Sequence, residues 1–222
     1  MILFVDGIDG SGKTTLIRHL ADALTCGSAQ AYVAEPLWRY LAPITAPEQF
    51  DPWVTSSSEL DVATALMTAM TDRVNNLHWA NGRQPHVHLV DRGPKTVYAS
   101  ARAHAEDQCW KPGAVRALLA DAVRALQDAQ PCMAVELSTG AALEIALPRI
   151  ESSQTVTPRY LKYLRAFSEE MDAASDWPGL PAQRLNPSAP VERNCRAAVE
   201  ALRLIHNPDH SRHHPPAHRP AP

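Results

Sequence analysis

A short apolar run followed by a glycine-rich turn is the feature that most limits the folds open to this chain. Residues 2–5 are continuously apolar, and the turn that follows reads Gly7-Ile8-Asp9-Gly10-Ser11-Gly12-Lys13-Thr14. Leucine and isoleucine then recur at helical spacing, at Leu16, Ile17, Leu20 and Leu24. The turn fits the pattern GxxxxGK[ST] at every fixed position, and it stands between a strand and a helix, which is the context that gives the pattern meaning. The sequence therefore predicts a phosphate-binding loop that opens a parallel α/β fold.

This loop predicts the binding of a nucleoside triphosphate with magnesium. Its glycines let backbone N–H groups converge on phosphate oxygens, Lys13 reaches the β- and γ-phosphates, and the Thr14 hydroxyl is a ligand for Mg²⁺. ATP and Mg²⁺ are the expected cofactors. The loop residues expected to hold them are Gly7, Gly10, Ser11, Gly12, Lys13 and Thr14.

The remainder of the chain alternates between strand-like and helix-like segments. Short, mostly apolar runs occupy residues 31–34, 87–90 and 133–137, and residues 183–185 are the expected last strand. Apolar stripes at helical spacing occupy residues 62–77, 115–126, 158–171 and 191–204. This alternation predicts a three-layer α/β/α sandwich with a central five-stranded parallel sheet, formed by residues 1–206 as one domain. Residues 38–60 contain three prolines and are expected to form a long functional loop.

Charged side chains that directly follow a strand are expected near the phosphate loop, because the carboxyl ends of parallel strands share one edge. Asp91 can hold magnesium through water, and Arg92 can contact phosphates where donor meets acceptor. Glu35 can accept a proton from a hydroxyl or bond to a sugar. Trp38 can stack on a base, although hydrophobic cover for the loop is slightly favoured. A surface ion pair is the alternative for Asp91 and Arg92, and a loop carboxylate for Glu35.

Charge and composition favour small anionic ligands over polymers. The formal net charge of -3 provides no overall attraction to nucleic acid or to an anionic membrane. The opening apolar run is too short for a signal peptide or a membrane span, and the four cysteines are scattered as reduced thiols usually are. We therefore expect a cytoplasmic protein without a nucleic-acid polymer or membrane as partner. Residues 207–222 are rich in His and Pro and are predicted to be a disordered tail.

Together these segments resemble the thymidylate kinase group of nucleoside monophosphate kinases, with features shared by deoxynucleoside kinases. The resemblance runs from residue 1 to about 205 and is sharpest over residues 4–15, which are similar to the thymidylate kinase stretch FEGIDGAGKTT. It implies a nucleoside monophosphate kinase-like fold, and it adds Thr15 and Asp9 to the nucleotide site. The family carboxylate that matches Asp9 lies near the acceptor's sugar hydroxyl or the metal. A homodimer is also implied as possible.

Other short stretches carry the same resemblance. Residues 65–73 are similar to a family helix that ends in Ala-Asp-Arg, which implies that Arg73 contacts the acceptor nucleotide. Asp91-Arg92-Gly93 resembles the family's Asp-Arg-Tyr, with glycine in place of the aromatic residue. Pro148-Arg149-Ile150-Glu151 is similar to a flap, or LID, expected here at about 145–160, whose Arg149 would close over the transferring phosphates. Asn186 falls where the family holds adenine.

Two kinase functions compete on this evidence. A monophosphate acceptor is already anionic and needs cations, whereas a hydroxyl acceptor profits from a positioned carboxylate. Asp9, Arg73 and Arg92 favour an ATP-dependent, thymidylate (dTMP)-like kinase. Glu35, followed by Pro36 and Trp38 as in the Glu-Pro-x-x-Trp of deoxynucleoside kinases, favours a nucleoside or other small-molecule hydroxyl kinase.

A non-catalytic nucleotide-binding regulator is disfavoured, because Lys13 and Arg92 are both present and no guanine-reading Asn-Lys-x-Asp occurs. The expected catalytic residues are Asp9, Lys13, Glu35, Arg92 and Arg149. The acceptor is expected to contact Asp9, Glu35, Trp38, Arg73 and Arg92. The expected metal ligands are Thr14 and Asp91.

Overall fold

The computed structural model describes residues 1–26, 29–77, 86–104, 117, 120–121, 123–125, 127–128, 131–137, 142–153, 155–173 and 180–206. Its strands are β1 (Ile2–Gly7), β2 (Gln30–Val33), β3 (His86–Asp91), β4 (Cys132–Leu137) and β5 (Ala182–Leu185). Its helices are α1 (Lys13–Cys26), α2 (Phe50–Ser56), α3 (Glu59–Asn75), α4 (Pro94–His104), α6 (Ala142–Glu151), α7 (Pro158–Ala173) and α8 (Val191–His206), with short 3-10 turns η1 (Leu37–Tyr40) and η2 (Pro47–Gln49).

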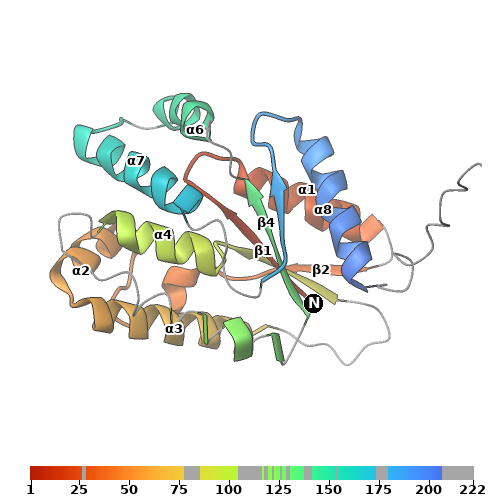
Figure 1. The fold of residues 1–222 in the computed structure, drawn as a ribbon, viewed down its shortest axis with the longest axis horizontal. Helices are drawn as coiled ribbons and strands as arrows, with labels where there is room; N and C mark the ends of the chain where they lie inside the picture. Colours follow the sequence, from red (N-terminus) through yellow and green to blue (C-terminus); the bar gives the residue numbers. More distant parts are fainter. Residues whose placement is uncertain are drawn as a thin grey trace, which may run out of the picture.

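The five strands form one parallel sheet in the order β2-β3-β1-β4-β5, which confirms the predicted fold class (Figure 1). The central strand β1 pairs with β3 on one side and β4 on the other, with Val5 opposite both Asp91 and Val135. This register carries β1, β3 and β4 to the same edge of the sheet. The phosphate loop, Asp91 and Arg92 therefore start from neighbouring points.

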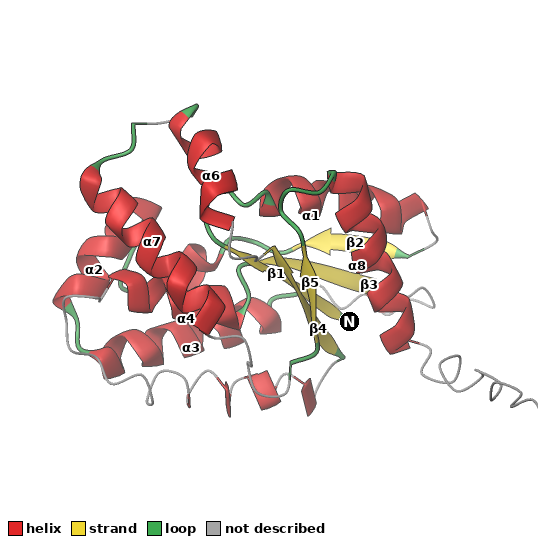
Figure 2. Ribbon diagram, turned by 45° about the horizontal axis from the view of Figure 1, so that its top comes forward, coloured by secondary structure: helices red, strands yellow, loops and turns green. Residues whose placement is uncertain are grey.

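Side-chain alternation along β1 divides the core into two layers. Ile2 and Phe4 pack with α3 and α4 on one face, whereas Leu3 and Val5 pack with α1 and α8 on the other. Both faces of a parallel sheet are normally buried in this way, which explains the unbroken apolar run at the start of the chain. A third cluster joins Ile8 of the phosphate loop to α4, α6 and α7 (Figure 2).

The expected long loop at 38–60 is wrong, because most of that segment is helical. It contains most of η1, all of η2 and α2, and the start of α3. The Ser58 side chain caps α3 by accepting a hydrogen bond from the Asp61 N–H. Pro47 begins η2, a position where the missing N–H of proline costs nothing. Leu37, Leu41 and Val54 are buried in the core. Proline therefore marks helix starts here.

The other predicted segments lie closer to the observed elements. The flap segment is divided between the end of α6 and the start of α7, and the helices predicted from residue 158 and over 191–204 are confirmed as α7 and α8. Half of the predicted helix at 115–126 lies outside the described residues, and the described half is helical. The predicted tail at 207–222 lies wholly outside them. Among the described residues, no helix is both long and apolar enough to cross a membrane.

Candidate active site

The phosphate loop has a backbone that only glycine can adopt at three positions. Gly7, Gly10 and Gly12 have φ angles of 151°, 74° and 101°. A Cβ on Gly7 would lie 2.7 Å from Ser11 Oγ, and one on Gly10 would lie 2.8 Å from the Ala146 carbonyl oxygen. These glycines let the loop turn tightly against α6.

Lys13 is buried inside the loop. Its Nζ donates a hydrogen bond to the Ile8 carbonyl oxygen at 2.9 Å. Burial lowers the pKa of Lys13 from its usual value, and the positive charge of Arg92 acts in the same direction. A phosphate close to Nζ would replace this carbonyl partner and restore stabilisation of the ammonium charge.

A cavity of about 600 Å³, the donor cavity, lies around the loop. The predicted loop residues that line it are Asp9, Gly10, Ser11, Gly12, Lys13, Thr14 and Thr15. Gly7 and Asn186 do not belong to its lining. The Gly7 N–H donates to Thr96 Oγ1 at 3.0 Å, and Asn186 Oδ1 accepts from the Ser188 N–H at 2.8 Å. Gly7 therefore ties the phosphate loop to α4, and Asn186 holds the turn after β5.

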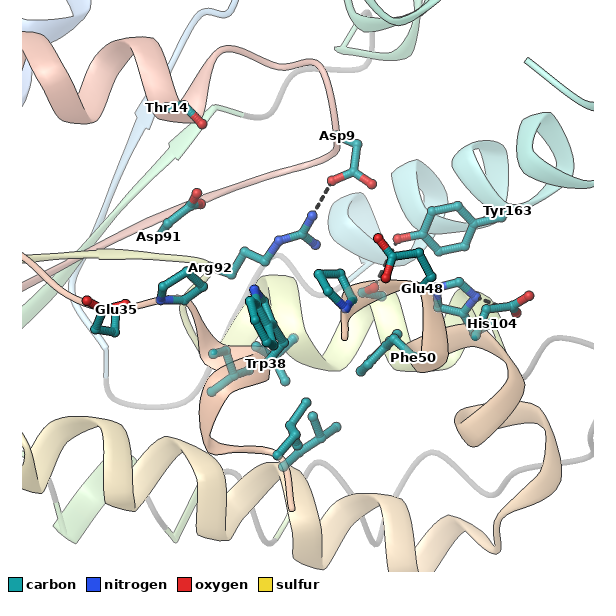
Figure 3. Close-up of a pocket in the computed structure, with 18 of the residues that line it drawn as sticks. Asp9, Thr14, Glu35, Trp38, Glu48, Phe50, Asp91, Arg92, His104 and Tyr163 are labelled. Atoms are coloured by element: carbon teal, nitrogen blue, oxygen red, sulfur yellow. Dashed lines mark hydrogen bonds and ion pairs between the residues drawn. The ribbon is translucent and has the colours of Figure 1, made fainter. Parts of the chain in front are cut away.

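A second cavity of about 770 Å³, the acceptor cavity, lies next to the donor cavity. The two share four lining residues, namely Asp9, Thr14, Asp91 and Arg92. Figure 3 shows Glu35, Asp91 and Thr14 toward one end of the acceptor cavity, and Glu48, Phe50, His104 and Tyr163 toward the other, with Trp38 and Arg92 between. A group transferred from one cavity to the other would cross at the shared residues.

Arg92 occupies this junction in an uncommon backbone conformation. Its φ of 63° makes it the one non-glycine residue with positive φ in the described part of the chain. Such a conformation costs about 1–3 kcal/mol, and here the hydrogen bond from the Arg92 N–H to the Val5 carbonyl oxygen at 3.0 Å helps to hold it. The turn directs the Arg92 side chain back toward the phosphate loop, where its guanidinium meets Asp9.

Asp9 is charged because of this contact. Partial burial by itself raises the pKa of Asp9, but the positive charges of Arg92 and Lys13 outweigh that effect and hold the pKa below its usual value. The Tyr160 hydroxyl of α7 approaches the other carboxylate oxygen at 3.4 Å. Asp9 therefore connects the phosphate loop to β3 and to α7.

The structure has no space for a side chain at Gly93, where the resembling family has an aromatic residue. A Cβ at this position would lie 2.7 Å from both Asp6 Oδ2 and Phe4 Cβ. Asp6 is fully buried, and its Oδ1 accepts from the Thr96 N–H at 3.1 Å. Burial raises the pKa of Asp6 to about 6. The close approach of β1 to the start of α4 leaves no room for a side chain after Arg92.

Asp91 and Thr14 fit the magnesium role predicted for them. Asp91 Oδ1 is buried and has no hydrogen-bond partner, and the two residues line both cavities. An unpaired buried carboxylate oxygen beside a hydroxyl is an oxygen donor set of the kind that Mg²⁺ prefers. No group of three or more potential metal-ligating side chains occurs in the described part of the chain, so phosphates and water would supply the other ligands.

Arg73 is not brought to the acceptor cavity. The side chain is 1% exposed and does not line either cavity. Its Nη1 donates to the Asp91 carbonyl oxygen at 2.8 Å, which ties α3 to the end of β3. The direct acceptor contact implied by the family resemblance has no support in this geometry, because the buried Arg73 side chain contacts the backbone of Asp91 instead of the cavity.

Glu35 and Trp38 both line the acceptor cavity, as predicted. Glu35 is exposed and forms an ion pair at 2.7 Å with Arg39, one helical turn later. Trp38 also packs against the core cluster beneath η1, so it serves as cover and as cavity wall at once. The two interpretations of Trp38 are compatible.

Apart from Arg159, which falls in the expected flap segment, the residues at the far end of the acceptor cavity were not predicted from the sequence. His104 Nδ1 lies 2.9 Å from Asp51 Oδ1, and Arg159 Nη2 lies 2.6 Å from Asp51 Oδ2. The His104 ring stacks on Tyr163 with centroids 4.1 Å apart, and the Tyr163 hydroxyl is 2.9 Å from Ser100 Oγ. These residues come from α2, α4 and α7, and no local pattern in the sequence connects them.

Arg149 extends from α6 across the donor cavity. Its Nη1 donates to the Gly10 carbonyl oxygen at 3.3 Å and its Nη2 to the Pro187 carbonyl oxygen at 3.5 Å. The flap arginine predicted from the sequence is therefore on the donor side, between the phosphate loop and the loop after β5.

No model of a known protein family matches the chain, and no curated protein matches it in sequence. Solved structures do share its fold. The deoxyadenosine kinase from M. mycoides with bound dATP is 10% identical with a TM-score of 0.59, over 91% of this chain and 100% of that one. The same enzyme with bound dCTP is 12% identical with a TM-score of 0.59, over 91% and 99% of the two chains. This chain thus has the α/β fold of the P-loop kinases.

Proposed function

We propose that this protein is an ATP-dependent nucleoside kinase, which transfers a phosphoryl group to a hydroxyl of a nucleoside, with deoxynucleosides as the first candidates. The observation that carries the proposal is the charge of the acceptor cavity. Its described lining contains five carboxylates, namely Asp9, Glu35, Glu48, Asp51 and Asp91. It contains two guanidinium groups, those of Arg92 and Arg159, and each is already paired with a carboxylate.

A nucleoside monophosphate would meet repulsion in such a cavity. Its phosphate carries a charge of about -1.5 to -2 near neutral pH and would need unpaired cations. Arg73, the cation that the thymidylate kinase resemblance supplies, is buried beneath the site. Burial lowers the pKa of His104, against the opposing effect of Asp51, so the imidazole is neutral at pH 7 and adds no positive charge. A neutral nucleoside incurs no such penalty.

The structural neighbours support the same choice. The solved structures with the matching fold include a deoxyadenosine kinase, which favours the nucleoside alternative over a dTMP kinase. The neighbour with bound dATP also supports an adenine nucleotide as a ligand of this chain.

The residues divide the reaction between them in the following way. The loop N–H groups and Lys13 hold the donor phosphates, and Thr14 and Asp91 would hold Mg²⁺, which would offset the negative charge of the phosphates. Glu35 takes the proton from the acceptor hydroxyl as its oxygen attacks the γ-phosphorus, and the bond to the β-phosphate oxygen breaks. Arg92 leaves Asp9 for the phosphoryl oxygens as charge develops there.

ADP release from ATP and Mg²⁺ tests this proposal against a panel of nucleosides and their 5′-monophosphates. We expect turnover with at least one deoxynucleoside and none above background with the monophosphates. Turnover with monophosphates alone would establish the thymidylate-like alternative, and no turnover with any acceptor would refute both.

Glu35→Gln tests the role of the carboxylate. General base catalysis contributes about 10²–10⁴-fold, so we expect a loss of kcat of that order with nearly unchanged acceptor affinity. Glu200→Gln, an exposed substitution on α8, is the matched control and should behave like the natural sequence. Turnover of Glu35→Gln within about threefold of the control would remove Glu35 from the chemistry.

A further inference from the structure

A buried ion pair lies beneath the phosphate loop, and the chemistry proposed above does not use it. Lys95, in the first turn of α4, places its Nζ 2.8 Å from Glu136 Oε2 of β4. The two side chains are 2% and 3% exposed. The described linings of the donor and acceptor cavities contain neither residue. Any effect of the pair on a reaction in these cavities must therefore act through other residues.

The pair belongs to a row of charged residues across the sheet. Asp6 of β1 is in register with Glu136, and Glu136 is in register with Arg184 of β5. Arg184 Nε lies 3.8 Å from Glu136 Oε2. The row lies at the start of the phosphate loop, because Gly7 directly follows Asp6. Lys95 reaches the row from α4 and ties the first turn of that helix to this edge of the sheet.

The Lys95–Glu136 contact is better suited to fixing a position than to stabilising the fold. A buried ion pair contributes little net stability, because both groups lose their hydration. Apolar side chains of similar volume avoid this cost, and replacing a buried pair by them is often neutral or stabilising. An ion pair differs from apolar packing because it holds two particular atoms at one separation. The pair therefore fixes where the first turn of α4 lies relative to β4.

The first turn of α4 follows closely on Arg92, whose backbone has a φ of 63°. A conformation of this kind persists only where the surrounding structure holds it. On the β1 side, the Thr96 N–H donates to Asp6 Oδ1 at 3.1 Å, and the Gly7 N–H donates to Thr96 Oγ1 at 3.0 Å. Lys95 supplies the anchor on the β4 side. The turn that carries Arg92 is thus held against two neighbouring strands.

We propose that Lys95 and Glu136 are positioning residues, whose buried ion pair keeps Arg92 in its left-handed conformation with its guanidinium at the boundary of the two cavities. The kinetic consequence of this inference rests on the kinase function proposed above, whereas its structural consequence does not. Without the pair, the first turn of α4 can shift, and the guanidinium then meets the transferring phosphoryl group less well. A misplacement of about 1 Å far from the chemistry can lower a rate by about a hundredfold.

Replacement of both partners tests the proposal without leaving a buried charge. We expect Lys95→Met/Glu136→Leu to keep the urea unfolding midpoint and, within about threefold, the ATP affinity, while kcat falls by about ten- to a hundredfold. Arg102→Met/Glu170→Leu is the matched control, because it removes an ion pair that joins α4 to α7 and should keep kcat. A kcat within about threefold of the control, or a loss of kcat that only follows a loss of folded protein, would overturn the proposal.

A double-mutant cycle with Arg92→Ala shows whether the pair acts through Arg92. If it does, adding Lys95→Met/Glu136→Leu to Arg92→Ala lowers kcat no further, because the guanidinium that the pair positions is already absent. A further loss of about tenfold in that background would refute the positioning of Arg92.

If the double substitution prevents folding, Glu136→Gln takes its place in the cycle. It keeps the shape of the side chain and one oxygen for Lys95 Nζ, but a neutral amide holds the ammonium less firmly than a carboxylate. We expect a loss of kcat of roughly three- to tenfold with Arg92 present and none in Arg92→Ala. An equal loss in both backgrounds would refute the proposal.

A crystal structure of the folded variant gives a readout that needs no turnover, so it separates failure of this inference from failure of the proposed kinase function. We expect Arg92 to lose its positive φ or its contact with Asp9. Retention of both would overturn the proposal whatever the kinetics.

Discussion

The Arg92 guanidinium lies 2.5 Å from the Asp9 carboxylate, at the boundary that the donor and acceptor cavities share. One residue comes from the phosphate loop and the other from the end of β3, 83 positions later. The pair neutralises both groups until a phosphate arrives. Because phosphate oxygens compete for the guanidinium at the same point, Arg92 is positioned to exchange a resting partner for a transferring group.

Arg92→Ala is expected to lower kcat by at least about a hundredfold, since an arginine that stabilises a transferring phosphoryl group contributes about 10³–10⁵ in the strongest cases. The affinity for ATP should change little, because Lys13 and the loop N–H groups remain. Steady-state kinetics and nucleotide binding check the two quantities separately. A parallel loss of ATP affinity and turnover would instead assign Arg92 to ground-state binding.

Asp6 predicts a pH dependence of stability. Its pKa is raised in the folded state from 3.8 to about 6, so folding favours the protonated carboxyl. Between these values the folded protein binds more protons than the unfolded chain, and the stability contribution of Asp6 falls as pH rises, by about 3 kcal/mol in total. Above about pH 7, where Asp6 is ionised in both states, this loss of stability no longer changes with pH.

Asp6→Asn removes this titration while keeping an oxygen for the Thr96 N–H. The difference in free energy of unfolding between Asp6→Asn and the natural sequence should move by about 2–2.5 kcal/mol in favour of the variant from pH 4 to pH 7. Urea unfolding across that range measures it, with Asp22→Asn on the exposed side of α1 as control. A constant difference would mean that Asp6 keeps an ordinary pKa.

Gly93→Ala is expected to destabilise the fold, because the new methyl group would lie 2.7 Å from both Asp6 Oδ2 and Phe4 Cβ. Overpacking of this kind costs about 1–3 kcal/mol in urea unfolding. The shift would also displace Arg92, so kcat should fall together with stability. Unchanged stability would show that β1 and α4 can separate without cost.

Arg73→Met tests whether this arginine serves the fold or the acceptor. We expect a loss of about 1–3 kcal/mol in the free energy of unfolding, since the Asp91 carbonyl oxygen loses a buried donor. The dissociation constant of the acceptor should stay within about threefold of the natural value. A tenfold weaker acceptor with unchanged stability would restore the acceptor role implied by the resemblance.

Local patterns predicted the elements that carry the donor site. The apolar run before Gly7 and the helical spacing after Thr14 located β1 and α1, and both exist for the reasons that the pattern implies. The same reasoning is wrong at residues 38–60, where the prolines suggest a loop but the chain forms short helices. Proline restricts the backbone conformation of the residue before it but is tolerated in the first turn of a helix that follows. The presence of proline alone therefore does not distinguish a loop from the start of a helix.

The sequence by itself determined the phosphate loop, the parallel sheet and the presence of Asp91 and Arg92 at its edge, because each depends on neighbours within about one turn or one strand. Only the tertiary structure decided that Arg73 is buried, that Asp51, His104 and Arg159 meet, and that the acceptor cavity has more carboxylates than cations. Those facts depend on segments distant in the chain that are brought together by packing. The acceptor that we propose follows from the sum of their charges, which no single segment contains.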